Sequence, residues 1–138
     1  MSGVTKRVWI DSWQMQCCGT PFEVGSVVTW DLVPVESVGR GHLAGFLGDE
    51  LANEISDWEE HHGGGGNDER QGEASTGTVL AIEVVYYEIA PSDARRRDEL
   101  VLVPGSTVGV SRSSVQTQEP TEDGLHHRGY IIDLEITP

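Results

Sequence analysis

Two cysteines and two histidine pairs are the side chains best suited to hold a metal ion: Cys17, Cys18, His61, His62, His126 and His127. Zinc takes cysteine sulfur and histidine nitrogen in tetrahedral sites. The common spacings are missing, because neither Cys-x-x-Cys nor His-x-x-x-His occurs. Neighbouring residues on a strand point to opposite faces, so one member of each pair would have to converge on a zinc ion. The alternative is a buried Cys17, a Cys18 in a turn, and histidines at a helix end and in a loop.

Cys18 could also act as a nucleophile, which would make the protein a thiol enzyme. A reactive thiolate needs a nearby cation or a helix N-terminus. Neither is visible in the local sequence, and the charge of the chain is negative. The carboxylate pairs Glu59-Glu60 and Glu122-Asp123 are adjacent in the chain and are typical of surface charge. We therefore assign no catalytic residue.

Aromatic residues form a second candidate site, a groove that would grip a peptide or a small ligand. Small binding domains often use such grooves. The residues are Trp9, Trp13, Trp30, Tyr86 and Tyr87. The alternative is that these rings fill the core of the domain.

Acidic residues dominate the charge of the chain. Nine basic and 23 acidic residues give a formal net charge of −14. Such a charge repels phosphate backbones and anionic membranes over a Debye length of about 8–10 Å, so we expect no direct nucleic-acid binding and no membrane binding. Eight Asp or Glu and no Lys or Arg lie between Gly41 and Glu69. This segment suits a solvated helix face, or a docking surface for a basic partner formed by Glu50, Glu54 and Asp57.

Two further segments carry residue types that bind anions. The four glycines from Gly63 to Gly66 lack the following Lys-Ser/Thr of a phosphate-binding loop. The triplet Arg95-Arg96-Arg97 is most simply explained as balancing the negative charge of nearby acidic residues. Neither segment predicts a site.

The elements that must position these residues are mostly strands. Residues 6–18 have an extended pattern, and Gly19-Thr20-Pro21 predicts a turn into a second strand over Val27 to Val35 that pairs with the first as a hairpin. Pro34 indicates that this strand ends near an edge. Three later segments predict further strands and the last one alternates most clearly: Thr78 to Ile89, Leu100 to Val103, and Gly129 to Thr137.

One amphipathic helix is predicted between the second strand and the long strand, over residues 42–62. Its apolar stripe has helical spacing and comprises Leu43, Phe46, Leu47, Leu51, Ile55 and Trp58. His61 and His62 would lie in its last turn and Gly63 would end it. The glycine-rich residues 63–76 have almost nothing to bury and predict a mobile loop.

The chain of 138 residues is long enough for one domain with one core. Its 17 glycines and 6 prolines favour short strands and many turns. We expect a mostly β (α+β) fold, an SH3-like or OB-like barrel of five to six strands with the helix inserted after the second strand. Closure of such a barrel removes exposed strand edges.

The pattern Trp-x-x-x-Cys-Cys-Gly-x-Pro-Phe-x-Val-Gly-x-x-Val-x-Trp runs from Trp13 to Trp30. It resembles the signature of an uncharacterised family of small actinobacterial proteins, a domain of unknown function. Weaker similarities lie at residues 59–63 and 129–134. The resemblance implies a soluble bacterial or phage-borne protein and supplies no activity.

Residues 1–10 lack the apolar run of a signal peptide, and no run of 18 apolar residues occurs. We therefore expect a cytoplasmic protein. The leading hypothesis is a non-enzymatic acidic β-barrel interaction module that binds a protein partner. The alternatives are a metal-dependent or thiol enzyme with a Cys/His site, and an acidic nucleic-acid mimic that inhibits a DNA- or RNA-binding protein.

Overall fold

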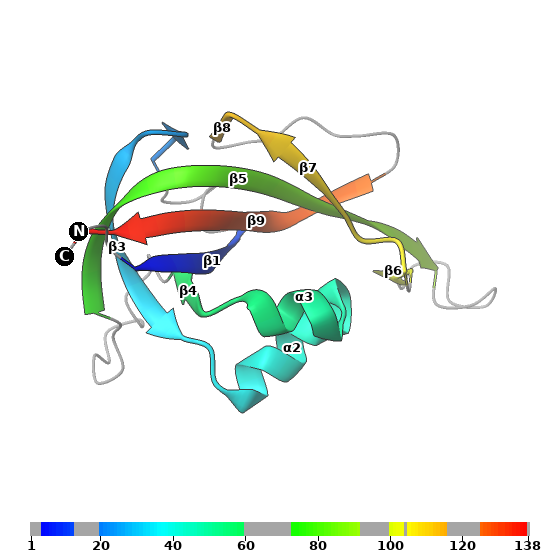
Figure 1. Ribbon diagram of the computed structural model, residues 1–138. Helices are drawn as coiled ribbons and strands as arrows, with labels where there is room; N and C mark the ends of the chain where they lie inside the picture. The colour runs from blue at the N-terminus through cyan, green and yellow to red at the C-terminus, as the bar shows by residue number, and fades with distance from the viewer. Residues whose placement is uncertain are drawn as a thin grey trace.

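The computed structural model describes residues 4–12, 20–59, 73–91, 100–103, 105–115 and 125–137, and the fold they form is mostly β (Figure 1). The strands are β1 (Thr5–Asp11), β2 (Phe22–Glu23), β3 (Val27–Pro34), β4 (Asp57–Glu59), β5 (Glu73–Pro91), β6 (Leu100–Leu102), β7 (Val108–Arg112), β8 (Ser114–Val115) and β9 (Leu125–Ile136). Two short helices follow β3, namely α2 (Ser37–Leu47) and α3 (Asp49–Glu54). Within these ranges, neither helix has the length and apolar character needed to cross a bilayer.

The long antiparallel pair β5 and β9 is the centre of a seven-stranded sheet. The strand order is β3-β4-β1-β9-β5-β6, and β7 also pairs with β5. β1 pairs with β4 in parallel and with β9 antiparallel. Because β3 pairs with both β4 and β5, the pairings of β3, β4, β1, β9 and β5 form a closed circuit.

One core cluster is built by alternate residues of the central strands. Val8 and Ile10 of β1 lie opposite Ile132 and Tyr130 of β9, and all four are fully buried. The alternation of apolar side chains predicted for the last strand is confirmed at Tyr130, Ile132 and Leu134, which belong to this cluster. Strands β2 and β8 add Phe22 and Val115.

A second core cluster lies between the other face of the central strands and the two helices. Trp9 and Ile131, which face each other in register, meet Leu43 and Leu47 of α2 and Ile55 after α3. Figure 1 shows both helices on one side of the sheet, next to β4. This layer explains why the middle of β1 and the middle of β9 are buried on both faces. Ile131 is buried, as are Tyr130 and Ile132 on either side of it.

The single helix predicted over residues 42–62 is wrong in its bounds. Helix begins at Ser37, is interrupted at Gly48, which has a φ of 88°, and ends at Glu54. That φ favours glycine, so the chain turns there and continues as α3. Asp57–Glu59 is a strand because it pairs with both β1 and β3.

The predicted hairpin between the first strand and Val27–Val35 is also wrong, because β4 lies between β1 and β3. The second strand, predicted over Val27 to Val35, spans Val27–Pro34. Pro34 does not mark a sheet edge, because it pairs with Asp57 of β4. Of the predicted glycine-rich loop, residues 63–72 lie outside the described part of the chain, and residues 73–76 belong to β5.

Candidate functional site

The predicted aromatic groove is absent from the described part of the chain. Trp9 and Tyr86 are 1% and 0% exposed and belong to the two core clusters. Trp30 packs against the Phe22 ring edge-on at 5.1 Å between centroids, and Tyr87 stacks on His126 at 5.5 Å. Trp13 lies outside the described residues. Trp9 and Tyr86 fill the core and Trp30 packs against it, as the alternative interpretation had it for these three rings.

Of the predicted metal ligands, the structure describes only His126 and His127. They are neighbours on β9 opposite Tyr87 and Tyr86. His127 packs edge-on against the Tyr130 ring at 4.8 Å and lies 5.6 Å from that of Tyr86, whereas His126 is exposed. They therefore point to opposite faces and do not share one ion.

The other predicted ligands, Cys17, Cys18, His61 and His62, lie outside the described residues. Within the ranges that the structure describes, no group of three or more His, Cys, Asp or Glu side chains could hold a metal ion. A site that includes the remaining four residues stays a prediction.

The three residues of the predicted acidic helix face lie in three different environments. Glu50 is exposed on α3. Glu54 also lies on α3 but forms an ion pair with Arg7. Asp57 is not on a helix: its side chain is 5% exposed in β4, and the Lys6 ammonium lies 3.3 Å from its Oδ2. The three carboxylates therefore do not form one docking face.

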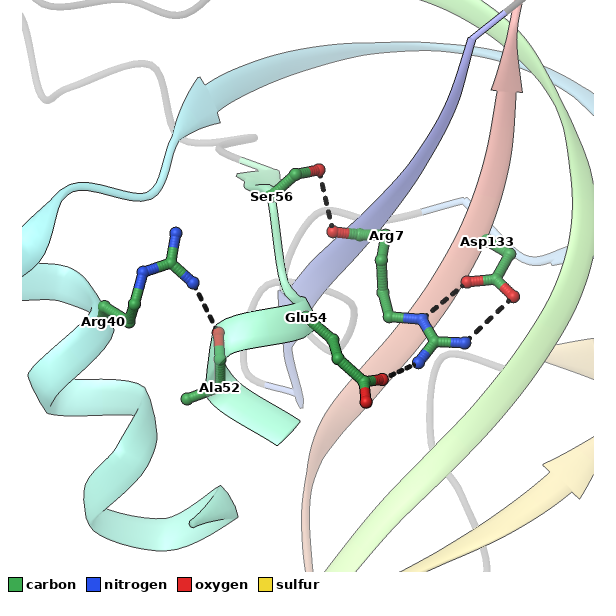
Figure 2. Close-up of polar contacts among 6 residues, drawn as sticks. All are labelled: Arg7, Arg40, Ala52, Glu54, Ser56 and Asp133. Carbon is green, nitrogen blue, oxygen red and sulfur yellow. Dashed lines mark hydrogen bonds and ion pairs between the residues drawn. The ribbon is translucent and has the colours of Figure 1, made fainter. Parts of the chain in front are cut away.

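Arg7 on β1 connects α3 to Asp133 on β9 (Figure 2). Its Nε donates to Oδ1 of Asp133 at 2.9 Å, one Nη donates to Oδ2 at 3.3 Å, and the other donates to Glu54. These contacts raise the pKa of Arg7, the hydrogen bond to Asp133 most of all, and partial burial opposes the rise. The Arg7 carbonyl accepts hydrogen bonds from the backbone N–H and the hydroxyl of Ser56.

Arg40 on α2 connects the helical segment through hydrogen bonds to three backbone carbonyls. One Nη donates to the carbonyls of Ala52 at 2.6 Å and Ile55 at 3.0 Å, and the other donates to Val35 at 3.3 Å. Figure 2 shows the contact between Arg40 on α2 and Ala52 on α3. The end of a helix leaves carbonyl groups short of backbone donors. Ala52 accepts from the Ile55 N–H, and the guanidinium adds a second donor to Ala52 and a donor to Ile55.

An open pocket of about 500 Å³ lies where the end of β3, the start of α2 and β4 meet. It is lined by Val33, Pro34, Glu36, Gly39, His42 and Trp58. The half-buried Trp58 indole lies directly against Gly39. A Cβ added at that position would lie only 2.6 Å from the ring. Glu36 is exposed immediately before the helix. The pocket thus joins an aromatic ring and aliphatic groups with a carboxylate.

The sequence interpretation missed this pocket because it placed Trp58 on the buried stripe of a helix. Its lining comes from β3, from α2, which follows β3 directly, and from β4 farther along the chain. Pro34 at a strand end and Gly39 within a helix are local signals, but neither indicates a shared site. Only the pairing of β4 with β3 and β1 brings Trp58 next to them.

Residues 4–136 of the chain match a family described as a family of unknown function, DUF6578. The match covers nearly the whole chain, much more than the segments that suggested a resemblance. No curated protein and no solved structure matches the chain. The site is therefore interpreted from its own geometry.

Proposed function

The chain belongs to the family of unknown function DUF6578, and from the arrangement of its charges we propose that it is a non-enzymatic interaction module that binds a basic protein partner. One observation carries the proposal. The described basic side chains are engaged in contacts within the chain, whereas many exposed carboxylates are not. Within the described part of the chain, the surface available to a partner is therefore negative.

Each basic side chain in the described ranges has a contact within the chain. Lys6 and Arg7 form ion pairs with carboxylates. Arg40 donates to backbone carbonyls, and Arg128 donates to Asp11 at 3.0 Å. Arg112 is likewise not free. These cations are thus already occupied before any partner arrives.

The exposed carboxylates form the opposite set. They lie on β2, α3 and β5 and just before α2, and none forms an ion pair with a described basic residue: Glu23, Glu36, Asp49, Glu50 and Glu88. Together with the net charge of −14, they produce a field that attracts a basic surface. Such a field accelerates association and selects partners by charge.

The alternatives find less support. An acidic mimic of nucleic acid needs a continuous ridge of carboxylates, but Glu54 is bound to Arg7 and Asp57 is buried. A metal-dependent or thiol enzyme would depend on Cys17 and Cys18, which lie outside the described residues. Both remain hypotheses that the residues described do not favour.

The closed circuit of strand pairings supports a finer statement about the fold. We propose that β3, β4, β1, β9 and β5 form a small barrel of the SH3-like or OB-like kind, since closure leaves these strands without free edges. The proposal also includes a cytoplasmic location and an actinobacterial origin, as the resemblance implied.

Selection from a random peptide library displayed on phage tests the function. We expect peptides selected at about 0.15 M salt to carry net positive charge, and their affinity to fall as salt screens the interaction. A selection that returns only neutral or acidic peptides, or none, would contradict the proposal. The same selection on denatured protein controls for unspecific attraction to the acidic chain.

A further inference from the structure

We infer that the pocket over Trp58 is the site that receives a lysine or arginine side chain of the partner. This inference rests on the proposed function and deepens it, because it names the group recognised and the place of recognition. It starts from the chemistry of the lining, which combines apolar walls with the Glu36 carboxylate and the His42 imidazole.

The walls suit the aliphatic stem of a long basic side chain. Val33 and Pro34 at the end of β3 provide aliphatic surface, and Trp58 on β4 provides an indole. Lysine and arginine bury their methylene stems along apolar surface while the charged head stays accessible. The pocket of about 500 Å³ is open on one side, so a side chain carried by another molecule can enter it.

The charged head finds two attractive groups there. A cation is attracted to the face of an indole ring, and tryptophan is the strongest of the aromatic side chains in this role. Glu36 adds an exposed carboxylate that forms no ion pair with a described basic residue. An aliphatic side chain would satisfy only the apolar part of this lining, and an acidic one would be repelled by Glu36, whereas a basic one satisfies both parts.

The pocket is also preformed. Gly39 leaves space for the Trp58 ring against α2, since any Cβ there would collide with Cη2 of the ring. Trp58 in turn packs on the second core cluster. A ring held in place loses little freedom when a ligand binds, which favours affinity.

The pocket between α2 and α3, about 450 Å³, is a weaker candidate for a cationic side chain. It is lined by Arg40 and has no aromatic wall. A guanidinium within the lining opposes a second cation, although it is engaged by carbonyl groups. The lining over Trp58 contains no lysine or arginine.

Nuclear magnetic resonance with two small probes tests the inference without a known partner. The probes are N-acetyl-lysine methylamide and its norleucine counterpart, which lacks the ammonium group. We expect the lysine probe to shift the indole N–H signal of Trp58 and the amide of Gly39, and to bind at least about fivefold more tightly than the norleucine probe. N-acetyl-arginine methylamide should behave as the lysine probe does. Equal shifts by the lysine and norleucine probes, or none at Trp58, would overturn the inference.

A matched pair of variants locates the effect. Glu36→Gln should weaken binding of the lysine probe about fivefold, whereas Glu23→Gln on β2, also exposed, should weaken it by less than about twofold, because Glu23 contributes only to the long-range field. Thermal unfolding of both variants confirms that they fold. Equal weakening by the two substitutions would mean that only the overall charge matters, and would overturn the assignment of the pocket.

The two proposals can fail separately. If peptides selected from the library are basic but leave the Trp58 indole signal unshifted, the module binds a basic partner elsewhere and the pocket assignment is wrong. If the lysine probe shifts Trp58 while the library yields no basic peptide, the pocket assignment stands and the proposed partner is wrong.

Discussion

Arg7 and Asp133 face each other in register on β1 and β9, and the guanidinium Nε of Arg7 donates to Oδ1 of Asp133 at 2.9 Å. The pair also has a second hydrogen bond at 3.3 Å and a link through Arg7 to Glu54 on α3. It therefore ties α3 to the sheet by polar contacts, in addition to the apolar packing of the second core cluster.

Substitution of Asp133 by asparagine should destabilise the protein modestly. Both side chains are partly exposed, 37% for Arg7 and 28% for Asp133, so solvent screening limits the loss to about 1 kcal/mol. Urea unfolding of Asp133→Asn, Arg7→Met and the double variant measures the coupling. A double variant whose loss equals the sum of the single losses would show that the pair contributes nothing.

The contribution of this pair should not depend on arginine titration near neutral pH. The pKa of Arg7 is raised, chiefly by its hydrogen bond to Asp133. A raised pKa contributes stability that is complete below the ordinary value and is lost only as pH rises through the folded-state value. For arginine this is strongly alkaline solution, so the coupling energy should be constant between about pH 6 and about pH 9. A decline of the coupling energy over that window would contradict the assignment.

Two glycines of α2 should respond in opposite directions to alanine. A Cβ at Gly39 would lie 2.6 Å from the Trp58 ring, whereas a Cβ at Gly41 meets nothing within 4 Å. We expect Gly39→Ala to destabilise by about 1–3 kcal/mol through overpacking, and Gly41→Ala to stabilise by about 0.5–1 kcal/mol through helix propensity. Thermal unfolding of the two variants side by side measures both changes. If Gly39→Ala were as stable as Gly41→Ala, Trp58 would not be held against the helix.

The parts of the fold that the sequence predicts are those set by local pattern. In β9, Tyr130, Ile132 and Leu134 lie at alternate positions and enter the first core cluster as the pattern indicates, whereas Ile131 on the opposite face is buried in the second core cluster. The start of the helical segment is less clear, since Gly39 and Gly41 weaken the signal of α2. The break at Gly48 was signalled only by a glycine, a residue that helices also tolerate.

The parts that the sequence does not predict depend on pairing between distant segments. Asp57–Glu59 follows a helix and has helical spacing, but β1 and β3 on either side make it a strand. The pocket depends on the same pairing, because Trp58 reaches Val33 only across β3 and β4, where the two residues lie opposite each other. No local pattern encodes such a contact. The acidic charge, by contrast, is a property of composition and is visible at once.

Arg40 should be difficult to replace, even by lysine. Its guanidinium donates to three carbonyls, those of Val35, Ala52 and Ile55. Arg40→Lys retains the charge but loses the planar fork that reaches all three. We expect a loss of about 1–3 kcal/mol because the three carbonyls lose this donor, although Ala52 still accepts from the Ile55 N–H. Urea unfolding measures it. A variant as stable as the original protein would mean that water replaces the guanidinium without cost.

Asp57 should matter for stability and Glu50 should not, although the sequence placed both on one acidic face. The Asp57 side chain is 5% exposed and lies 3.3 Å from the Lys6 ammonium, whereas Glu50 is exposed and forms no ion pair with a described residue. Asp57→Ala should destabilise by about 1–3 kcal/mol, because a partly covered ammonium loses its partner and a buried space opens. Glu50→Ala should leave the melting temperature nearly unchanged while weakening the binding of the selected basic peptides. Equal melting temperatures for the two variants would contradict the burial of Asp57 and would support the acidic face predicted from the sequence.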